Sequence, residues 1–215
     1  DDYWTDPLKL QKQVDFLESN PDIVMTYGNA TIEDLTETYH KKVNYINGFT
    51  AKKIMFHQVI GMGLPTLTMV FRNVLTFPNW FSNVKSGDMF LRLLLSKHGD
   101  FYYHGETFGV HRKHEGGVSR TNDKLEWNLN SAKHLKLFLS DCHKNQKESV
   151  NKAIAKHYIY AFYTSLMNES SIKPLTLFFK CLSSKGFYTR QGIGLMRLLF
   201  KEVILKKNIN ILDIF

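Results

Sequence analysis

The first 120 residues switch between helical and strand-like patterns of apolar positions. Leu10, Val14 and Leu17 recur at helical spacing, between a Thr-Asp-Pro start at residues 5–7 and an Asn-Pro stop at 20–21. Another helix is expected over residues 86–97. Short apolar, β-prone runs predict buried strands at residues 23–27, 67–71, 101–103 and 107–112. Strands that alternate with helices indicate an α/β sheet.

The polar stretch between the predicted strands at residues 23–27 and 67–71 has a less regular pattern. Residues 31–48 are typical of loops, with a short edge strand at 43–46. Thr50 can cap a short helix that runs through Gln58. Gly105 is expected to separate the last two strands of this part of the chain.

After Ser119 the strand pattern ends and only helical periodicity follows. Helices are expected over residues 125–142, 150–167, 172–183 and 189–206. The chain therefore divides into an α/β part, residues 1–120, and a helical extension, residues 121–215.

Charge follows the same division. The chain carries 28 Lys+Arg and 20 Asp+Glu, a net charge of +8. Residues 1–120 have equal numbers of each sign, so the whole excess lies in residues 121–215. This asymmetry favours a neutral body with a basic appendage that meets nucleic acid or an anionic membrane. The alternative is a solvated helical surface rich in lysine.

Composition excludes several protein classes. A hydrophobic content of 43% rules out a disordered chain. Two cysteines, Cys142 and Cys181, are too few for a disulfide framework and favour a reducing compartment. No apolar run reaches the roughly 20 residues of a membrane span, and no basic-then-apolar leader opens the chain. Its first residue is Asp1 in place of Met, so we expect a piece of a longer chain.

The last 44 residues combine lysine and arginine with large apolar side chains. The apolar residues from Leu195 to Leu205 are interrupted by Arg197, Lys201 and Glu202, so the segment is amphipathic. Such a helix can lie in the headgroup region of an anionic membrane. The alternative is a helix that packs on the body of the protein.

Three segments carry candidate chemistry. Asp1 and Asp2 are adjacent carboxylates, which suit a hard divalent cation, although helix-flanking acids are common. Asp88 opens a helix, where an ordinary cap is the alternative. His111, Arg112 and His114 precede a Gly-Gly pair and form a loop that can close over an anionic ligand, although single histidines are more often structural.

Together these segments resemble the C-terminal half of a family 2 glycosyltransferase with the GT-A fold, of the bacterial kind that builds surface polysaccharides. The resemblance covers residues 1–120 and rests on four stretches: the start DDYWTDPLKLQKQ at residues 1–13, PTLTMVFR at 65–72, Gly-Asp at 87–88 and RKHEGGVS at 112–119. The first and last are the specific ones. The start is similar to the segment that runs on from the DxD-type metal motif of that family.

The resemblance implies a donor-binding role for four residues. Asp1 is the last carboxylate of the metal motif and, with His114, would hold Mn²⁺ or Mg²⁺ against the diphosphate of a nucleotide-sugar donor. Asp2 would support Asp1. Asp2, Arg112 and His114 are the expected donor and cofactor contacts. The residues that select the donor base and ribose would precede Asp1.

The resemblance implies an acceptor-side role for four more. Asp88 occupies the place of the catalytic base, which takes a proton from the acceptor hydroxyl in an inverting transfer. Trp4, Thr68 and Arg72 would line the acceptor site. The implied protein transfers a sugar to a glycan or lipid-linked acceptor in cell-surface polysaccharide synthesis. We expect it in the cytoplasm, with peripheral contact at the inner face of the plasma membrane.

Two other functions fit parts of the sequence. One is a non-catalytic module whose basic helices bind nucleic acid or another anionic surface, since aromatic residues such as Tyr158, Tyr160, Phe162 and Tyr163 lie among the lysines. No nucleic-acid-binding motif is present, so nucleic acid is not an expected partner. The other is a transferase relative that binds sugar without turnover.

Overall fold

The computed structural model describes residues 2–35, 42–48, 50–60, 63–115, 123–167, 174–188 and 190–200. The chain divides into two compact units. We call residues 1–78 with 88–121 the sheet unit, and residues 79–87 with 122–215 the helical unit. The division at 121/122 lies next to the boundary that the sequence predicts. Residues 79–87 group with the helices, whereas the sequence boundary places them in the first part.

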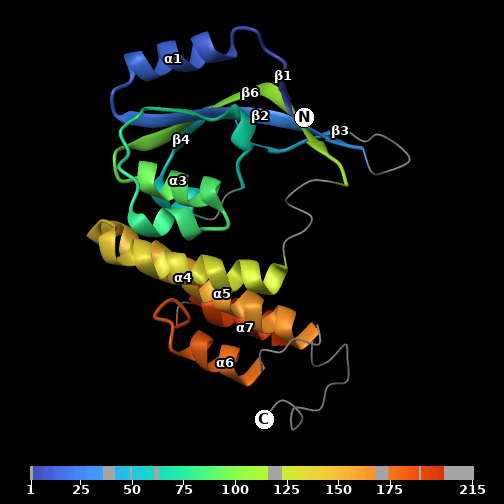
Figure 1. Ribbon diagram of the computed structural model, residues 1–215, viewed down its shortest axis with the longest axis vertical. Coiled ribbons are helices and arrows are strands. Elements are labelled where there is room, and N and C mark those ends of the chain that lie inside the picture. The colour runs from blue at the N-terminus through green and yellow to red at the C-terminus, as the bar shows by residue number, and fades with distance from the viewer. Residues whose placement is uncertain are drawn as a thin grey trace. The chain divides into compact units, whose positions relative to one another are not determined.

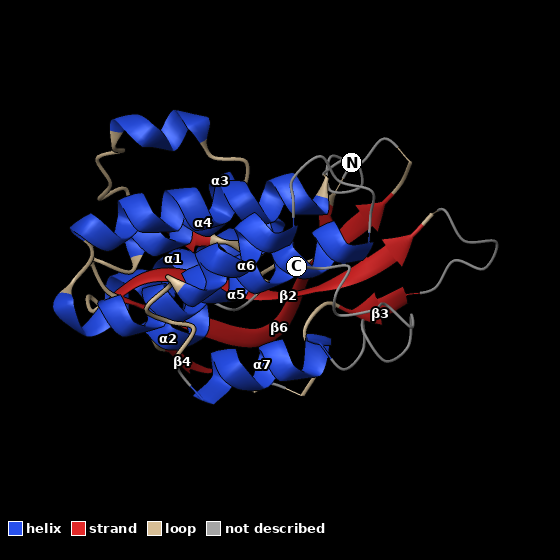
Figure 2. Cartoon of the chain, turned by 90° about the horizontal axis from the view of Figure 1, so that it is seen from below, coloured by secondary structure: helices blue, strands red, loops and turns tan. Residues whose placement is uncertain are grey.

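Six strands of the described residues form one mixed sheet around a parallel pair. The two central strands are β2 (Ile23–Asp34) and β6 (Asp100–Lys113), which pair along nearly their whole length. The short strands add to them antiparallel: β1 (Tyr3–Trp4) and β4 (Lys52–Ile54) on β6, and β3 (Lys42–Asn44) and β5 (Val70–Phe71) on β2. Figure 2 shows β2 and β6 side by side. The expected mixed α/β class is confirmed.

The two faces of the sheet are covered by different helices. In Figure 1, α1 (Lys9–Ser19) lies over one face and α3 (Gly87–Leu95) over the other. Side chains along β6 point alternately to the two faces of the sheet. Phe101 and Tyr103 belong to the hydrophobic cluster on the α3 side, and Tyr102 and His104 contact Phe16 of α1.

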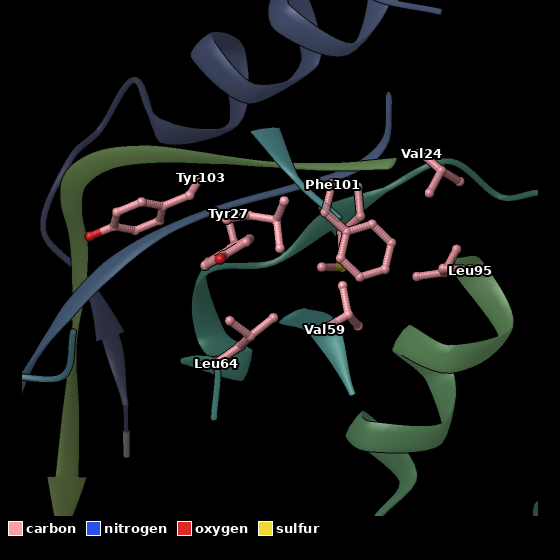
Figure 3. Close-up of a cluster of buried hydrophobic side chains, with 9 residues drawn as sticks. Val24, Tyr27, Val59, Leu64, Leu95, Phe101 and Tyr103 are labelled. Atoms are coloured by element: carbon pink, nitrogen blue, oxygen red, sulfur yellow. The ribbon is translucent and has the colours of Figure 1, made fainter. Parts of the chain in front are cut away.

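The α3 side of the sheet holds a largely hydrophobic layer. Phe101 of β6, Val59 of α2 (Phe56–Val59) and Leu95 of α3 point toward one another (Figure 3). All three side chains are buried. The cluster is completed by further buried residues: Val24, Met25, Tyr27, Ile54, Leu64 and Tyr103. Burial of this apolar area is what attaches α2 and α3 to the sheet.

The α1 side combines the aromatic contacts of Phe16 with buried polar residues of α1 that the sequence pattern does not predict. Leu10 and Val14, the expected inward residues, are exposed, whereas Lys9 and Gln13 are buried together with Leu17. The Gln13 amide donates to Thr26 Oγ1 (2.9 Å) and to the Thr68 carbonyl (3.0 Å). Hydrogen bonds to a strand and a loop therefore decided the inward face of α1, which a hydrophobic pattern does not reveal.

Several short elements differ from the expectation. The strands at 101–103 and 107–112 are one strand, because β2 pairs across the irregularity at Gly105, whose φ is +80°. β2 continues beyond residue 27 to Asp34. Residues 52–54 form β4 where a helix from Thr50 was predicted, because β6 offers an edge to pair with. Residues 67–71 divide into a 3₁₀ turn, η1 (Thr66–Thr68), and β5.

The helical unit contains the four helices expected after Ser119. They are α4 (Lys124–Asp141), α5 (Lys147–Met167), α6 (Pro174–Leu182) and α7 (Arg190–Phe200), with 3₁₀ turns η4 (Lys144–Gln146) and η2 (Asn79–Asn83). α4, α6 and α7 all pack on α5. Residues 201–206 of the last predicted helix lie outside the described residues. Among the described helices, none is long and apolar enough to cross a membrane.

The buried Lys9 yields a stability prediction. Its amino group has no hydrogen-bond partner among the described residues and lies 4.4 Å from the centre of the Trp4 ring. Burial lowers the pKa of Lys9 from 10.5 to about 8. Between these values the unfolded chain binds more protons than the folded one, so the destabilisation due to Lys9 is complete below pH 8 and disappears as the pH approaches 10.5.

We therefore expect Lys9→Met to raise the free energy of unfolding by about 2 kcal/mol at pH 7 and by much less at pH 10, as measured by urea denaturation. Lys12→Met is the matched control on the same helix. Lys12 forms exposed ion pairs with Asp6 and Glu106, so its loss should leave stability unchanged or slightly lower. An equal effect of Lys9→Met at both pH values would contradict the prediction.

Candidate functional site

The carboxylate of Asp2 is held at the carboxyl end of β6. Strand β1 runs antiparallel to β6, with Tyr3 opposite Val110 and Trp4 opposite Gly109. A side chain at Gly109 would collide with the Tyr3 carbonyl and with Leu67, so glycine allows this close approach. Asp2 Oδ1 accepts the backbone N–H of Arg112 (2.9 Å), and Asp2 Oδ2 lies 3.2 Å from His111 Nδ1. Two of the predicted donor-side residues, Asp2 and Arg112, are thus brought together.

The Arg112 side chain is built into the same end of the sheet. Its guanidinium lies 5.0 Å from the centre of the Tyr3 ring, and Arg112 Nε is 3.5 Å from a carboxylate oxygen of Glu33. The strand register explains why these two side chains are close, because Glu33 of β2 and Arg112 of β6 are direct neighbours in the parallel ladder. His114 follows β6 at once and is partly buried. Arg112 and His114 therefore lie at the end of the sheet that holds Asp2.

Asp88 lies in the first turn of α3 and is anchored by Arg92, one turn later. Arg92 Nε donates to the Asp88 carbonyl (3.1 Å), and an Arg92 terminal nitrogen lies 3.7 Å from Asp88 Oδ2. The Arg92 side chain is 5% exposed and that of Asp88 is 41% exposed. A buried cation therefore orients a carboxylate that stays open to solvent, as a proton acceptor requires.

Tyr45 packs on His111, the partner of Asp2, and lies within electrostatic reach of Asp88. Burial raises the pKa of Tyr45, while Arg92 lowers it and Asp88 raises it, so both charges lie within electrostatic reach of the phenol. The Tyr45 ring meets His111 edge-on, with 6.2 Å between ring centres, and His111 contacts Asp2.

Trp4 and Thr68 hold the loop at residues 65–68. Trp4 Nε1 donates to the Leu67 carbonyl (2.8 Å), while half of the Trp4 side chain remains exposed. Thr68 is fully buried, and its hydroxyl bonds the Gly28 and Pro65 backbone. Trp4 can therefore face a ligand, whereas Thr68 acts on one only through the position of the loop.

Arg72 is not brought to this cluster. Its guanidinium bonds the carbonyls of Ile23 and Leu17 and pairs with Glu18. Those residues are the beginning of β2 and the end of α1. Asp2, Arg112 and Glu33 lie at the other end of the strand pair, roughly 30 Å away along ten residues of strand. In this structure Arg72 ties α1 to β2.

Three neighbours of the cluster did not stand out as site residues in the sequence. Arg92 was detectable in principle, since it lies four residues after Asp88 and so on the same face of the helix. His111 was noted as part of a loop, but its pairing with Asp2 spans more than 100 residues. Tyr45 lies beyond the end of a short edge strand, and no local pattern marks it.

The expected metal ligands are only partly described. Asp1 and residues 116–119 of the last motif lie outside the described residues. Within the described ranges, no group of three or more His, Cys, Asp or Glu side chains is placed to hold a metal ion. Both oxygens of Asp2 already have partners in Arg112 and His111, which fits a supporting carboxylate more closely than a metal ligand.

Comparison with known proteins identifies distant relatives without an assigned function. The chain is 25% identical over 121 residues to "Uncharacterized protein Mb1547" of Mycobacterium bovis, and equally to "Uncharacterized protein MT1570" and "Uncharacterized protein Rv1520" of Mycobacterium tuberculosis. The match covers 55% of this chain and 34% of each relative. The chain thus spans about a third of the length of these curated relatives. No family model and no solved structure matches the chain.

Proposed function

We propose that this chain is the acceptor-side part of a family 2 glycosyltransferase of the GT-A fold, followed by a helical extension. The proposal rests on the four sequence stretches that resemble this family and on one structural observation. Asp2 contacts both the backbone of Arg112 and the His111 ring at the carboxyl end of β6, and Tyr45 packs edge-on against the same His111. Two predicted donor-side residues that are far apart in sequence, Asp2 and Arg112, are therefore brought together.

The proposed chemistry is an inverting transfer with Asp88 as general base. The carboxylate of Asp88 takes the proton of an acceptor hydroxyl, whose oxygen forms the new bond to the anomeric carbon of the donor sugar. The bond from that carbon to the diphosphate breaks, and the nucleoside diphosphate leaves with the bonding pair. Arg92 contributes by orientation, because it holds both the backbone and the side chain of Asp88.

The donor diphosphate would lie at the carboxyl end of β6. Arg112 supplies positive charge there, and Asp2 braces the chain that carries Asp1. A divalent Mn²⁺ or Mg²⁺ would be held by Asp1 and His114, whose carboxylate and imidazole donors suit Mn²⁺ in particular. When bound, such an ion neutralises negative charge that develops on the leaving diphosphate.

The acceptor would meet Trp4, whose exposed ring offers an apolar stacking surface for a sugar. Thr68 would shape that side by fixing the loop, and Arg72 is no longer included among its contacts. The acceptor is proposed to be a glycan or a lipid-linked sugar, at the cytoplasmic face of the membrane. The nucleic-acid alternative is weakened because Tyr158 and Phe162 are buried in the helical unit and so are not available to stack on bases.

Asp88→Asn tests the proposed base. The amide is nearly isosteric and keeps a hydrogen-bond acceptor for Arg92, but it accepts no proton. In the full-length protein we expect an intact fold and donor affinity, with transfer slowed by a factor of about 10²–10⁴. Asp15→Asn, an exposed change on α1, is the matched control and should keep normal turnover. Near-normal transfer by Asp88→Asn would exclude Asp88 as the base.

Removal of the metal tests the donor site. In the full-length protein, Asp1→Ala should abolish nucleotide-sugar binding supported by Mn²⁺ or Mg²⁺, and His114→Ala should weaken it by about tenfold. His98→Ala removes an exposed histidine and should leave the titration unchanged. Isothermal titration with and without EDTA measures the effect. A donor affinity that EDTA leaves unaltered would rule out a metal-dependent site.

A further inference from the structure

The region between α6 and α7 presents aromatic and basic side chains to solvent. We call residues 176–188 together with Arg190 the α6–α7 corner. Its inward residues are Leu177, Cys181, Ser184 and Phe187, all of which are buried. Backbone hydrogen bonds from Ser183, Ser184 and Phe187 to earlier carbonyls hold this turn in a defined conformation. The side chains that point outward are therefore presented by an ordered segment.

The outward residues include two aromatic side chains. Phe179 is 59% exposed and Tyr188 is 67% exposed. Phe178 and Phe187 contact these rings edge-on from beneath, with 6.1 and 5.4 Å between ring centres. A phenylalanine ring has no polar atom to interact with water, so its exposure costs free energy that a partly apolar partner would recover.

The corner also presents cationic side chains outward. Lys180, Lys185 and Arg190 are exposed, as is Arg197 on the following helix. Residues 174–200 contain no Asp or Glu, so these four charges have no acidic neighbour in their own segment. A surface that combines exposed aromatic rings with several cationic side chains is complementary to a boundary between anionic headgroups and acyl chains.

We infer that the α6–α7 corner is a docking surface for anionic lipid bilayers. Phe179 and Tyr188 enter the boundary between headgroups and acyl chains, while the flexible stems of Lys180 and Lys185 let their ammonium groups reach the lipid phosphates. The contact lies within the last 44 residues, as the sequence predicts, but before the apolar run at residues 195–205. Met196, in the apolar run expected to face lipid, is buried in the helical unit, so at that position the helix packs on the protein.

Docking would give the proposed transferase access to a lipid-linked acceptor. This role of docking rests on the proposed function, whereas docking itself does not. The docking itself is tested without any measurement of transfer. Its failure therefore leaves the role of Asp88 open, and failure of the Asp88 test leaves docking open.

The experiment is co-sedimentation of the chain with vesicles of phosphatidylcholine alone or with 30 mol% phosphatidylglycerol, a proportion of about one anionic lipid in three. Binding should require the anionic lipid and should weaken as salt is raised, because salt screens surface charge. The charge reversal Lys180→Glu/Lys185→Glu should lower the partition coefficient by tenfold or more, about the effect of two basic residues at an anionic surface. Phe179→Ala/Tyr188→Ala should lower it by a similar factor.

Matched variants separate the corner from net charge and from general hydrophobicity. Lys133→Glu/Lys144→Glu changes the same charge at exposed sites elsewhere in the helical unit, and Phe77→Ala removes an aromatic ring that is 51% exposed. Both should bind as the unmodified chain does, and unchanged thermal unfolding shows that each variant folds.

Three results would overturn the inference. One is equal binding to neutral and anionic vesicles, or to neither. Another is loss of binding in the control variants as large as in the corner variants. The third is that the corner variants abolish retention on DNA or self-association, whereas vesicles do not bind the chain.

Discussion

The parallel pairing of β2 with β6 is the constraint on which the rest of the sheet unit depends. These two strands pair from Ile23 and Asp100 to Asp34 and Lys113, and every other strand of the described residues attaches to one of their outer edges. The pairing also fixes the candidate site, because it sets Glu33 beside Arg112 and Ile32 beside His111. A shift of one residue would turn each of these side chains to the opposite face.

The two faces of that sheet are stabilised in different ways. The face under α3 is an apolar layer around Phe101, where buried area contributes most of the stability. The face under α1 contains Gln13 and Thr68, whose hydrogen bonds fix the position of a loop, and the buried Lys9, which opposes folding at neutral pH. Hydrogen bonds give less net stability than apolar burial but impose a geometry. Specific hydrogen bonds thus position the loop that carries Leu67. Trp4 donates a hydrogen bond to the Leu67 carbonyl.

The helical unit has a hydrophobic core and a positively charged surface. α5 packs against its neighbours through residues such as Ile154, Ile159 and Phe162, so two of its four aromatic residues, Tyr158 and Phe162, belong to the core. Among the described residues of this part, the lysine and arginine side chains are exposed, except Lys152, which is partly exposed, so their charge does not oppose packing. Basic residues accompanied by exposed aromatic rings occur at the α6–α7 corner, which is where we propose the contact with lipid.

Several features of this protein follow from the sequence alone. Local periodicity predicts α3 and the four later helices, and the DDYW, Gly-Asp and RKHEGG stretches select the candidate residues. Helices and turns depend on contacts between residues close in the chain, so a local pattern carries that information. The polar inward face of α1 is not predicted, because its stability comes from hydrogen bonds to Thr26 and Thr68 that no local pattern contains.

Only the tertiary structure decides which candidates meet. It joins Asp2 to Arg112 and His111 and leaves Arg72 at the opposite end of β2, although both Asp2 and Arg72 lie in stretches with the same family resemblance. It also packs the Tyr45 ring edge-on against His111. These meetings depend on strand register and on closure of loops of 40 to 110 residues. The local sequence determines the residue types and the helical or strand periodicity. The distances between candidate site residues depend on how distant strands pair.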